Sequence, residues 1–322
     1  MANIQNKSNC TIALQNTVNS TQGVQSDNTL NSTLQKRQWT KYISKGHALT
    51  LMHYNQNSLL FKSYKNTSYC AEVLQTNTMG KLTTTYCKNR WCQTCNRIKT
   101  ARLINNYMPQ LENLKNAQFL TLTLPTITAD NLLNQISAME STWRKIYKKS
   151  KEAKYKKLYT PLKGIRKAET TIRPNGQYHY HFHLLLDNEP QANWVLQQWL
   201  QYNPTASRKA QDIRTATKGA YKELFKYAFK STIKMDSKIN AKRYDVVFAA
   251  LKNKRTFQAF GGIKKIDEDF KDEDLINNIS IEDSINKVYK WVVSDWYDKE
   301  TGEPLLNLEI PSKVKDLTNY PQ

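Results

Sequence analysis

The chain has 322 residues, enough for one large domain or two smaller ones, and its lysines and arginines outnumber its acids by 48 − 27 = 21. An excess of this size favours a polyanionic partner, because every phosphate that is neutralised releases condensed counterions. No apolar stretch approaches the roughly 20 residues of a membrane span, and none near the start resembles a signal peptide, so we expect a cytoplasmic protein without a membrane partner.

Residues 1–36 form a polar tail rich in asparagine, glutamine, serine and threonine. A segment with so few apolar anchors buries too little surface to offset its ordering entropy, so we predict that it is disordered. Cys10 lies in this tail and is given no role. The rest divides into an N-terminal region (37–113), a central domain (114–266), and an acidic connector with a C-terminal segment of unassigned role (267–322).

The N-terminal region contains a cysteine cluster. Cys92 and Cys95 have the spacing of a zinc knuckle, and Cys87 lies five residues before Cys92. We interpret the cluster as a small Zn²⁺-binding lobe, with reduced thiols packed in a core as the other interpretation. A tetrahedral site needs a fourth ligand. The candidates for it are, in order of preference, Cys70, then His47 and His53.

The central domain mixes strand and helix patterns. Residues 117–125 alternate until a proline, which predicts a strand. Apolar side chains recur with helical spacing over 129–149, and we expect further helices over 190–200 and 217–230. Elements in this order predict an α+β fold with a central, mainly antiparallel sheet and helices packed on it.

A basic run covers residues 144–167, with eleven lysines and arginines and one acid, Glu152. One interpretation is a solvated face or mobile loop, and the other is a surface that follows phosphates. Both remain open at this point.

Two strands are expected at 165–173 and 177–187, around the turn signal Pro174-Asn175-Gly176. On the second strand, His181 and His183 are two residues apart, so both side chains leave the same face. Two adjacent imidazoles form a metal chelate, which an oxygen ligand would complete. Structural histidines are the alternative interpretation.

The turn length decides which residue supplies that oxygen. In a three-residue turn, Glu169 lies directly opposite His181 and on the same face. In a two-residue turn, Glu169 would lie opposite Phe182 and away from the metal. Pro174 suits the first position of the longer turn, so we expect Glu169 to complete the site, with His179 as the alternative.

The expected helix at 217–230 carries Glu223, Tyr227 and Lys230 at positions i, i+4 and i+7, on one face. A tyrosine beside a metal site can attack phosphorus and leave a covalent phosphotyrosine, while a lysine offsets the charge. The chain has 18 tyrosines, however, and a tyrosine on an amphipathic helix is usually a packing residue.

Five segments, in this order, resemble motifs of the rolling-circle replication initiator (Rep) proteins of small bacterial plasmids, in the HUH endonuclease superfamily. They are 87–95, Phe119-Leu120-Thr121-Leu122-Thr123, 179–186, 223–230, and 250–255 with Gly261-Gly262. The resemblance spans about residues 65–266. It implies an HUH-type nuclease domain in a bacterial cytoplasm, and as partners the plasmid double-strand origin, its single-stranded nick site, and the host helicase and polymerase.

The resemblance also implies roles for individual residues. Tyr227 would nick one DNA strand and become linked to the 5′ phosphate, and the free 3′ hydroxyl would prime synthesis. His181 and His183 would bind Mg²⁺ or Mn²⁺. Glu223 matches the glutamate that activates water for the terminating cleavage in one branch of the family, and Lys230 matches a lysine three residues after the tyrosine.

Two other functions compete with this one. Another HUH enzyme, a relaxase or single-tyrosine transposase, would share the chemistry. Relaxases of this kind tend to place the tyrosine before the histidines, whereas Tyr227 follows them, and Glu223 favours an initiator. The second alternative is a non-catalytic, zinc-stabilised nucleic-acid-binding protein, which would form no covalent adduct with DNA.

Overall fold

The structure is a computed structural model that describes residues 26–77, 82–152, 161–225, 229–231, 237–266 and 285–318. Side chains in these ranges are described from residue 32 onward, except at 222, 229–231 and 285. Within this part of the chain, none of the helices has the combination of length and apolar character that crossing a membrane requires.

The helices of the described chain are α1 (Ser26–Tyr54), α2 (Phe61–Ser68), α3 (Gln93–Glu112), α4 (Ala129–Lys149), α6 (Glu189–Tyr202), α7 (Lys218–Phe225), α8 (Lys238–Ala250) and α9 (Ser312–Lys315), with a 3₁₀ turn at Arg208–Ala210. The strands are β1 (Val73–Asn77), β2 (Leu82–Thr84), β3 (Gln118–Thr123), β4 (Gly164–Ile172), β5 (Tyr178–Leu186), β6 (Asp212–Thr215), β7 (Phe229–Ser231), β8 (Phe257–Phe260), β9 (Ile285–Val292) and β10 (Asp295–Asp298).

Within the described residues, the larger sheet has six strands in the order β6-β3-β5-β4-β7, and β8 also pairs with β4. Every pairing is antiparallel except that of β7 with β4. The edge of β4 is shared, because residues 164–167 pair with β8 and residues 170–172 pair with β7. This architecture confirms the predicted α+β fold with a mainly antiparallel sheet.

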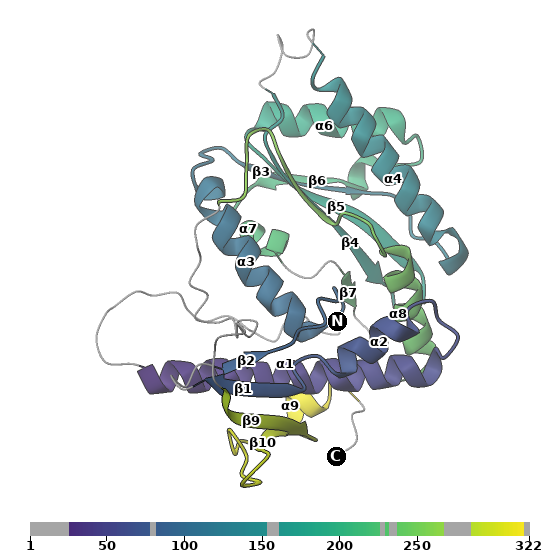
Figure 1. Ribbon diagram of the computed structural model, residues 1–322. Helices are drawn as coiled ribbons and strands as arrows, with labels where there is room; N and C mark the ends of the chain where they lie inside the picture. Colours follow the sequence, from purple (N-terminus) through teal and green to yellow (C-terminus); the bar gives the residue numbers. More distant parts are fainter. Residues whose placement is uncertain are drawn as a thin grey trace, which may run out of the picture.

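Helices cover both faces of this sheet (Figure 1). Along β5, Phe182 and Leu184 belong to the core that also contains Trp143 of α4 and Trp199 of α6. Leu185 belongs instead to the core formed with side chains of α3 and α7. Because strand side chains alternate, the odd-numbered histidines of β5 share the face of Leu185, on the side of α3 and α7.

The smaller sheet, in the order β10-β9-β1-β2, packs with α1 and α9 around a separate core that includes Tyr42, Trp291 and Trp296. The C-terminal segment, to which no role was assigned from sequence, therefore supplies two strands of this sheet. Its strand β9 pairs with β1, which lies far away in the sequence.

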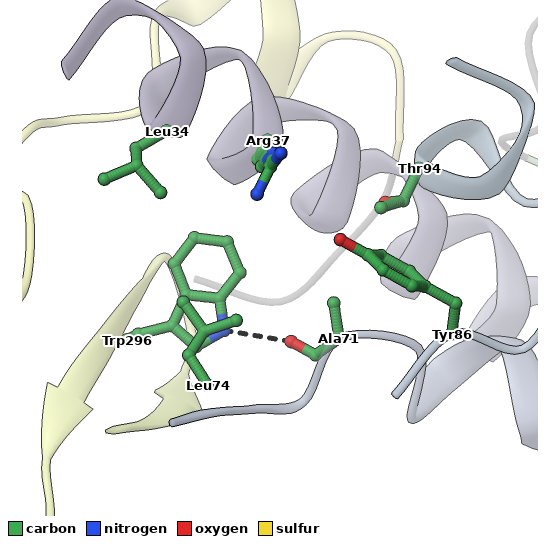
Figure 2. Close-up of a pocket in the computed structure, with 7 residues that line it drawn as sticks. All are labelled: Leu34, Arg37, Ala71, Leu74, Tyr86, Thr94 and Trp296. Carbon is green, nitrogen blue, oxygen red and sulfur yellow. Dashed lines mark hydrogen bonds between the residues drawn. The ribbon is translucent and has the colours of Figure 1, made fainter. Parts of the chain in front are cut away.

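The polar tail is shorter than predicted, because α1 begins at Ser26 and residues 26–36 are helical. Figure 2 shows the reason, since Leu34 and Arg37 of α1 lie above Trp296 of β10 and line a small pocket with it. The indole N–H of Trp296 donates to the carbonyl of Ala71 at 2.9 Å and fixes the ring. Leu34 thus lies against Trp296 of β10, a residue that is distant in the sequence.

Two further expectations need correction. The helix predicted over 217–230 is present over Lys218–Phe225 but does not reach Lys230, because Phe229–Ser231 form β7, which pairs with Thr170–Ile172. The basic run is not one surface, because Arg166 and Lys167 are buried in β4. Each forms an ion pair with an acid; those acids are Glu140 and Glu169 respectively.

Candidate metal and catalytic site

The turn between β4 and β5 has three residues, 174–176. The N–H of Arg173 donates to the carbonyl of Gln177 at 2.8 Å, and the N–H of Gly176 donates to the carbonyl of Arg173 at 2.9 Å. Gly176 has a φ of +84°, the left-handed conformation that this loop requires. As a result, Glu169 is paired with His181, which confirms the predicted register.

Glu169, His181 and His183 converge on one point. The Nε2 atoms of the two histidines are 3.1 Å apart, and the Nε2 of His183 is 3.9 Å from Oε2 of Glu169. One ligand atom from each of the three lies within 4.8 Å of the others. Two nitrogens and one carboxylate oxygen at these separations can hold a divalent cation and leave further coordination positions for water or substrate.

The second nitrogen of each ring fixes its orientation. The Nδ1 of His181 is 3.2 Å from the carbonyl of His179, and because a carbonyl only accepts, this nitrogen carries the proton and Nε2 presents its lone pair. The Nδ1 of His183 is 3.2 Å from the hydroxyl of Thr121 on β3. Such contacts hold metal-binding imidazoles in place. Thr121 lies on a strand that the sequence predicted, but nothing in the sequence gave it this role.

His179 is not part of this group. The guanidinium of Arg173 donates to its Nδ1 at 3.1 Å, so the proton lies on Nε2, which donates to the hydroxyl of Thr123. Burial, followed by the charges of His181 and Arg173, lowers the pKa of His179 to about 4. Between the two candidates for the third ligand, the geometry therefore favours Glu169.

Lys167 is a site residue that sequence reasoning missed. Its Nζ donates to Oε2 of Glu169 at 3.0 Å and to the backbone carbonyl of Glu223 at 2.9 Å. Its side chain is 3% exposed, and that of Glu169 is 2% exposed. A signal was present, because Lys167 precedes Glu169 by two residues and so shares its strand face, but we had assigned it to the basic run.

The remaining catalytic candidates are only partly placed. Glu223 lies in α7, and its backbone contacts Lys167. Tyr227 lies outside the described residues. Lys230 lies in β7, where its backbone pairs with Thr171, and its side chain is not among those described. The expectation that Glu223 and Lys230 share one helix face is therefore wrong.

The four described cysteines form a second cluster. The Sγ atoms of Cys70 and Cys95 are 3.5 Å apart, those of Cys87 and Cys95 are 3.6 Å apart, and all four lie within 4.8 Å of one another. Four thiolates around Zn²⁺ at about 2.3 Å form a tetrahedron with edges of about 3.8 Å, so the spacing fits a zinc site and is far too long for disulfides. Cys10 lies outside the described residues.

Backbone contacts within this cluster favour thiolates. The N–H of Cys87 lies 3.4 Å from the sulfur of Cys70, and the N–H of Cys95 lies 3.5 Å from that of Cys92. Hydrogen bonds from the neighbouring thiols, that of Cys70 first, hold the pKa of Cys92 well below its usual range, whereas hydrogen bonding, with Cys87 first, raises the pKa of Cys70. The alternative ligands lie elsewhere, since His47 contacts the carbonyl of Leu317. Cys70 is therefore the fourth donor of the cluster.

The fold is α+β with a mainly antiparallel larger sheet. It carries two candidate metal sites, one formed by a buried carboxylate and two imidazoles and the other by four cysteines. A family model described as replication protein matches residues 80–302. The chain therefore belongs to the replication protein family, which confirms the resemblance to plasmid replication initiators that the sequence indicated.

Two relatives are similar to the chain. One, named Protein rep, from Lentilactobacillus hilgardii, is 28% identical over 281 residues, which cover 75% of this chain and 88% of that protein. Another Protein rep, from Staphylococcus aureus, is 35% identical over 108 residues, which cover 31% of this chain and 44% of that protein. No solved structure matches the chain.

Proposed function

We propose that this replication protein initiates rolling-circle replication by nicking one strand of a plasmid origin through a covalent tyrosine intermediate. The observation that carries the proposal is the convergence of Glu169, His181 and His183 on one point of the sheet, in a chain of the replication protein family. The formal charge of +21 suits a DNA partner. Host helicase and polymerase are the further partners that this function requires.

The imidazole Nε2 atoms of His181 and His183 and the carboxylate of Glu169 would hold Mg²⁺ or Mn²⁺. When bound, such an ion polarises a phosphate and lowers the barrier to attack on phosphorus. The chain contributes a buried, preoriented donor set, because the Nδ1 contacts of both rings keep Nε2 directed at the site.

Tyr227 is the proposed nucleophile. Its phenolic oxygen attacks the scissile phosphorus and forms a bond to it, the bond from phosphorus to the 3′ oxygen breaks, and the phenolic proton is passed on as the 3′ hydroxyl is formed. Supporting this, the elements on either side of Tyr227 both contact β4 near Glu169. The carbonyl of Glu223 in α7 binds Lys167, and Phe229 in β7 pairs with Thr170.

Glu223 and Lys230 complete the proposed mechanism. Glu223 acts as the base that removes a proton from water in the cleavage that ends the replication cycle, in which the water oxygen bonds to phosphorus and the phosphorus–tyrosine oxygen bond breaks. Lys230 offsets charge on the phosphate or the tyrosinate. In the N-terminal lobe, Zn²⁺ held by the four-cysteine cluster would serve the fold and not the reaction.

The test is an adduct assay. Supercoiled DNA that carries the cognate origin is incubated with the protein and Mn²⁺, and the covalent protein–DNA product is resolved on a denaturing gel. We expect the adduct with the wild type and none with Tyr227→Phe. Tyr221→Phe, which changes another tyrosine of the same segment, serves as the matched control and should retain it.

Other outcomes of this assay would favour a different nucleophile or a different function. A well-folded wild type that forms no adduct would favour the non-catalytic DNA-binding protein. An adduct that survives in Tyr227→Phe and is lost in Tyr221→Phe would move the nucleophile to Tyr221. Activity on a transfer origin or transposon end, with none on a replication origin, would favour a relaxase or a transposase.

A further inference from the structure

We propose that Lys167 is a positioning residue that links the metal-binding carboxylate of Glu169 to the helix that carries Glu223. The inference rests on the proposed function of the metal site. It concerns a residue outside the donor set, whose single ammonium group contacts two parts of the site that belong to different elements.

The first contact determines where the ligand oxygen lies. Lys167 donates to Oε2 of Glu169, and this same oxygen is 3.9 Å from Nε2 of His183. Lys167 is also paired with His183 across the strands, so its side chain starts beside the site. A charged hydrogen bond to a metal-binding carboxylate restricts the rotation that would carry the oxygen away from the imidazoles.

The second contact holds α7. Glu223 is one of the last residues of this helix that the structure describes. Lys167 donates to the carbonyl of Glu223, and the hydroxyl of Thr100 donates to that of Phe225 at 3.0 Å. Lys167 and Thr100 therefore tie the last described residues of α7 to β4 and to α3.

Burial of the Lys167–Glu169 ion pair carries a desolvation cost. A lysine and a glutamate that are both almost fully inside the protein lose their hydration, and such a pair is retained only where its geometry and further hydrogen bonds compensate. Stability alone does not require a charged pair at this position, because apolar side chains of similar size often serve as well. A role in the metal site would account for the presence of a charged pair at this buried position.

The chain contains a matched control. Lys41 of α1 is also fully buried, and its Nζ donates to Oε2 of Glu72 at 2.7 Å and to the carbonyl of Ser68 at 3.0 Å. Each lysine thus binds one carboxylate and one backbone carbonyl. The difference is location, since Glu72 and Ser68 belong to the N-terminal lobe, near the four-cysteine cluster, and not to the site of Glu169, His181 and His183.

The experiment measures Mn²⁺ binding to the full-length protein without DNA by isothermal titration calorimetry, and then adduct formation at saturating Mn²⁺. We expect Lys167→Met to weaken Mn²⁺ binding about 10- to 100-fold. We also expect slower adduct formation that excess Mn²⁺ does not restore, because the contact that ties α7 to β4 is lost as well. Lys167→Arg should recover part of both. Lys41→Met should lower the melting temperature and leave Mn²⁺ affinity unchanged.

Two results would overturn the inference. One is a folded Lys167→Met variant with wild-type affinity for Mn²⁺, and the other is full recovery of the adduct rate at saturating Mn²⁺. If the methionine variant does not fold, Lys167→Gln, which keeps one amide donor, is measured against the same two criteria. A wild-type protein that binds no Mn²⁺ would instead refute the proposed metal site, and the inference with it.

Discussion

At the scale of single residues, the candidate site depends on which ring nitrogen of each histidine already contacts another protein group. The Nδ1 atoms of His181 and His183 are both in contact with other groups, which directs both Nε2 atoms to the same point. His179, on the same face, has both nitrogens engaged and is excluded from the donor set. Three histidines that look equivalent in the sequence therefore differ in which ring nitrogens are available to a metal ion.

Glu223 offers a test at this scale, because Lys167 donates to its backbone carbonyl, a group that a change of side chain leaves in place. In Glu223→Ala this contact is preserved, so we expect nicking to persist while hydrolytic release of the product falls by about 10²- to 10⁴-fold, the usual contribution of a general base. The measurement is the accumulation of covalent adduct over time. Equal loss of nicking and release would assign the glutamate to the metal site or to the fold.

Single residues of the site were predictable where strand periodicity decides the outcome. The two-residue alternation placed His181 and His183 together, and the turn chemistry of Pro174 brought Glu169 opposite them. Lys167 was missed because its role depends on its contact with Glu223 of α7, and no local pattern in the sequence specifies that contact. Contacts between elements that are distant in sequence lie outside what periodicity can indicate.

At the scale of elements, the close pairing of β4 with β5 holds the donor set. The helix predicted over 129–149 matches α4 because its apolar residues recur with regular helical spacing. The helix expected over 217–230 was extended too far, because Phe229–Ser231 satisfy their backbone on the edge of β4. Local propensity was overridden there by a free strand edge.

A glycine at the start of β4 tests how closely the two strands pack. A Cβ at Gly164 would lie 1.9 Å from the carbonyl oxygen of Leu185, which is backbone and cannot turn aside. We expect Gly164→Ala to lower the free energy of unfolding by about 1–3 kcal/mol, as overpacking does. Urea denaturation followed by circular dichroism measures this change.

The matched control for this variant is Gly219→Ala in α7, where the nearest atom to the new Cβ is 3.6 Å away. An alanine in a helix is favoured over glycine by up to about 1 kcal/mol, so this variant should be as stable as the wild type or more stable. Equal destabilisation by both substitutions would contradict the proposed close approach at Gly164.

At the scale of the whole molecule, the two sheets are joined by helices and by the cysteine cluster. Arg90, which follows Cys87 in the knuckle, donates to the carbonyls of Leu251 and Lys254 at the end of α8. The cluster therefore positions a residue that connects the N-terminal lobe to the helices packed on the larger sheet. We therefore expect loss of the cysteine cluster to lower the stability of both the N-terminal lobe and the larger sheet with its helices.

Metal analysis tests this expectation. The purified protein should contain about one Zn²⁺ per chain, lost in Cys92→Ser, and the variant should melt at a lower temperature because a structural zinc site contributes directly to folding. Ser44→Ala, which removes a hydroxyl 3.6 Å from the sulfur of Cys92 but no ligand, should retain the metal. Well-folded wild type without zinc would reject the zinc site.

The arrangement of the whole chain was the least predictable part. Leu34 and Trp296 lie at opposite ends of the sequence and line one pocket, so neither segment indicates the other. The polar composition before residue 36 suggests few anchors, but Leu34 is buried beside Trp296 and belongs to α1, which includes residues 26–36.

The pairing of β1 with β9 has a consequence for how the protein is made. Asn77 of β1 is synthesised 285 − 77 = 208 residues before Ile285 of β9. At about 5–20 residues per second, a ribosome needs about 10–40 s to cover that distance, and β1 presents an unpaired edge throughout. Phe260 ends the last described strand of the larger sheet, so a nascent chain contains the described strands of that sheet before β9 is available to pair with β1.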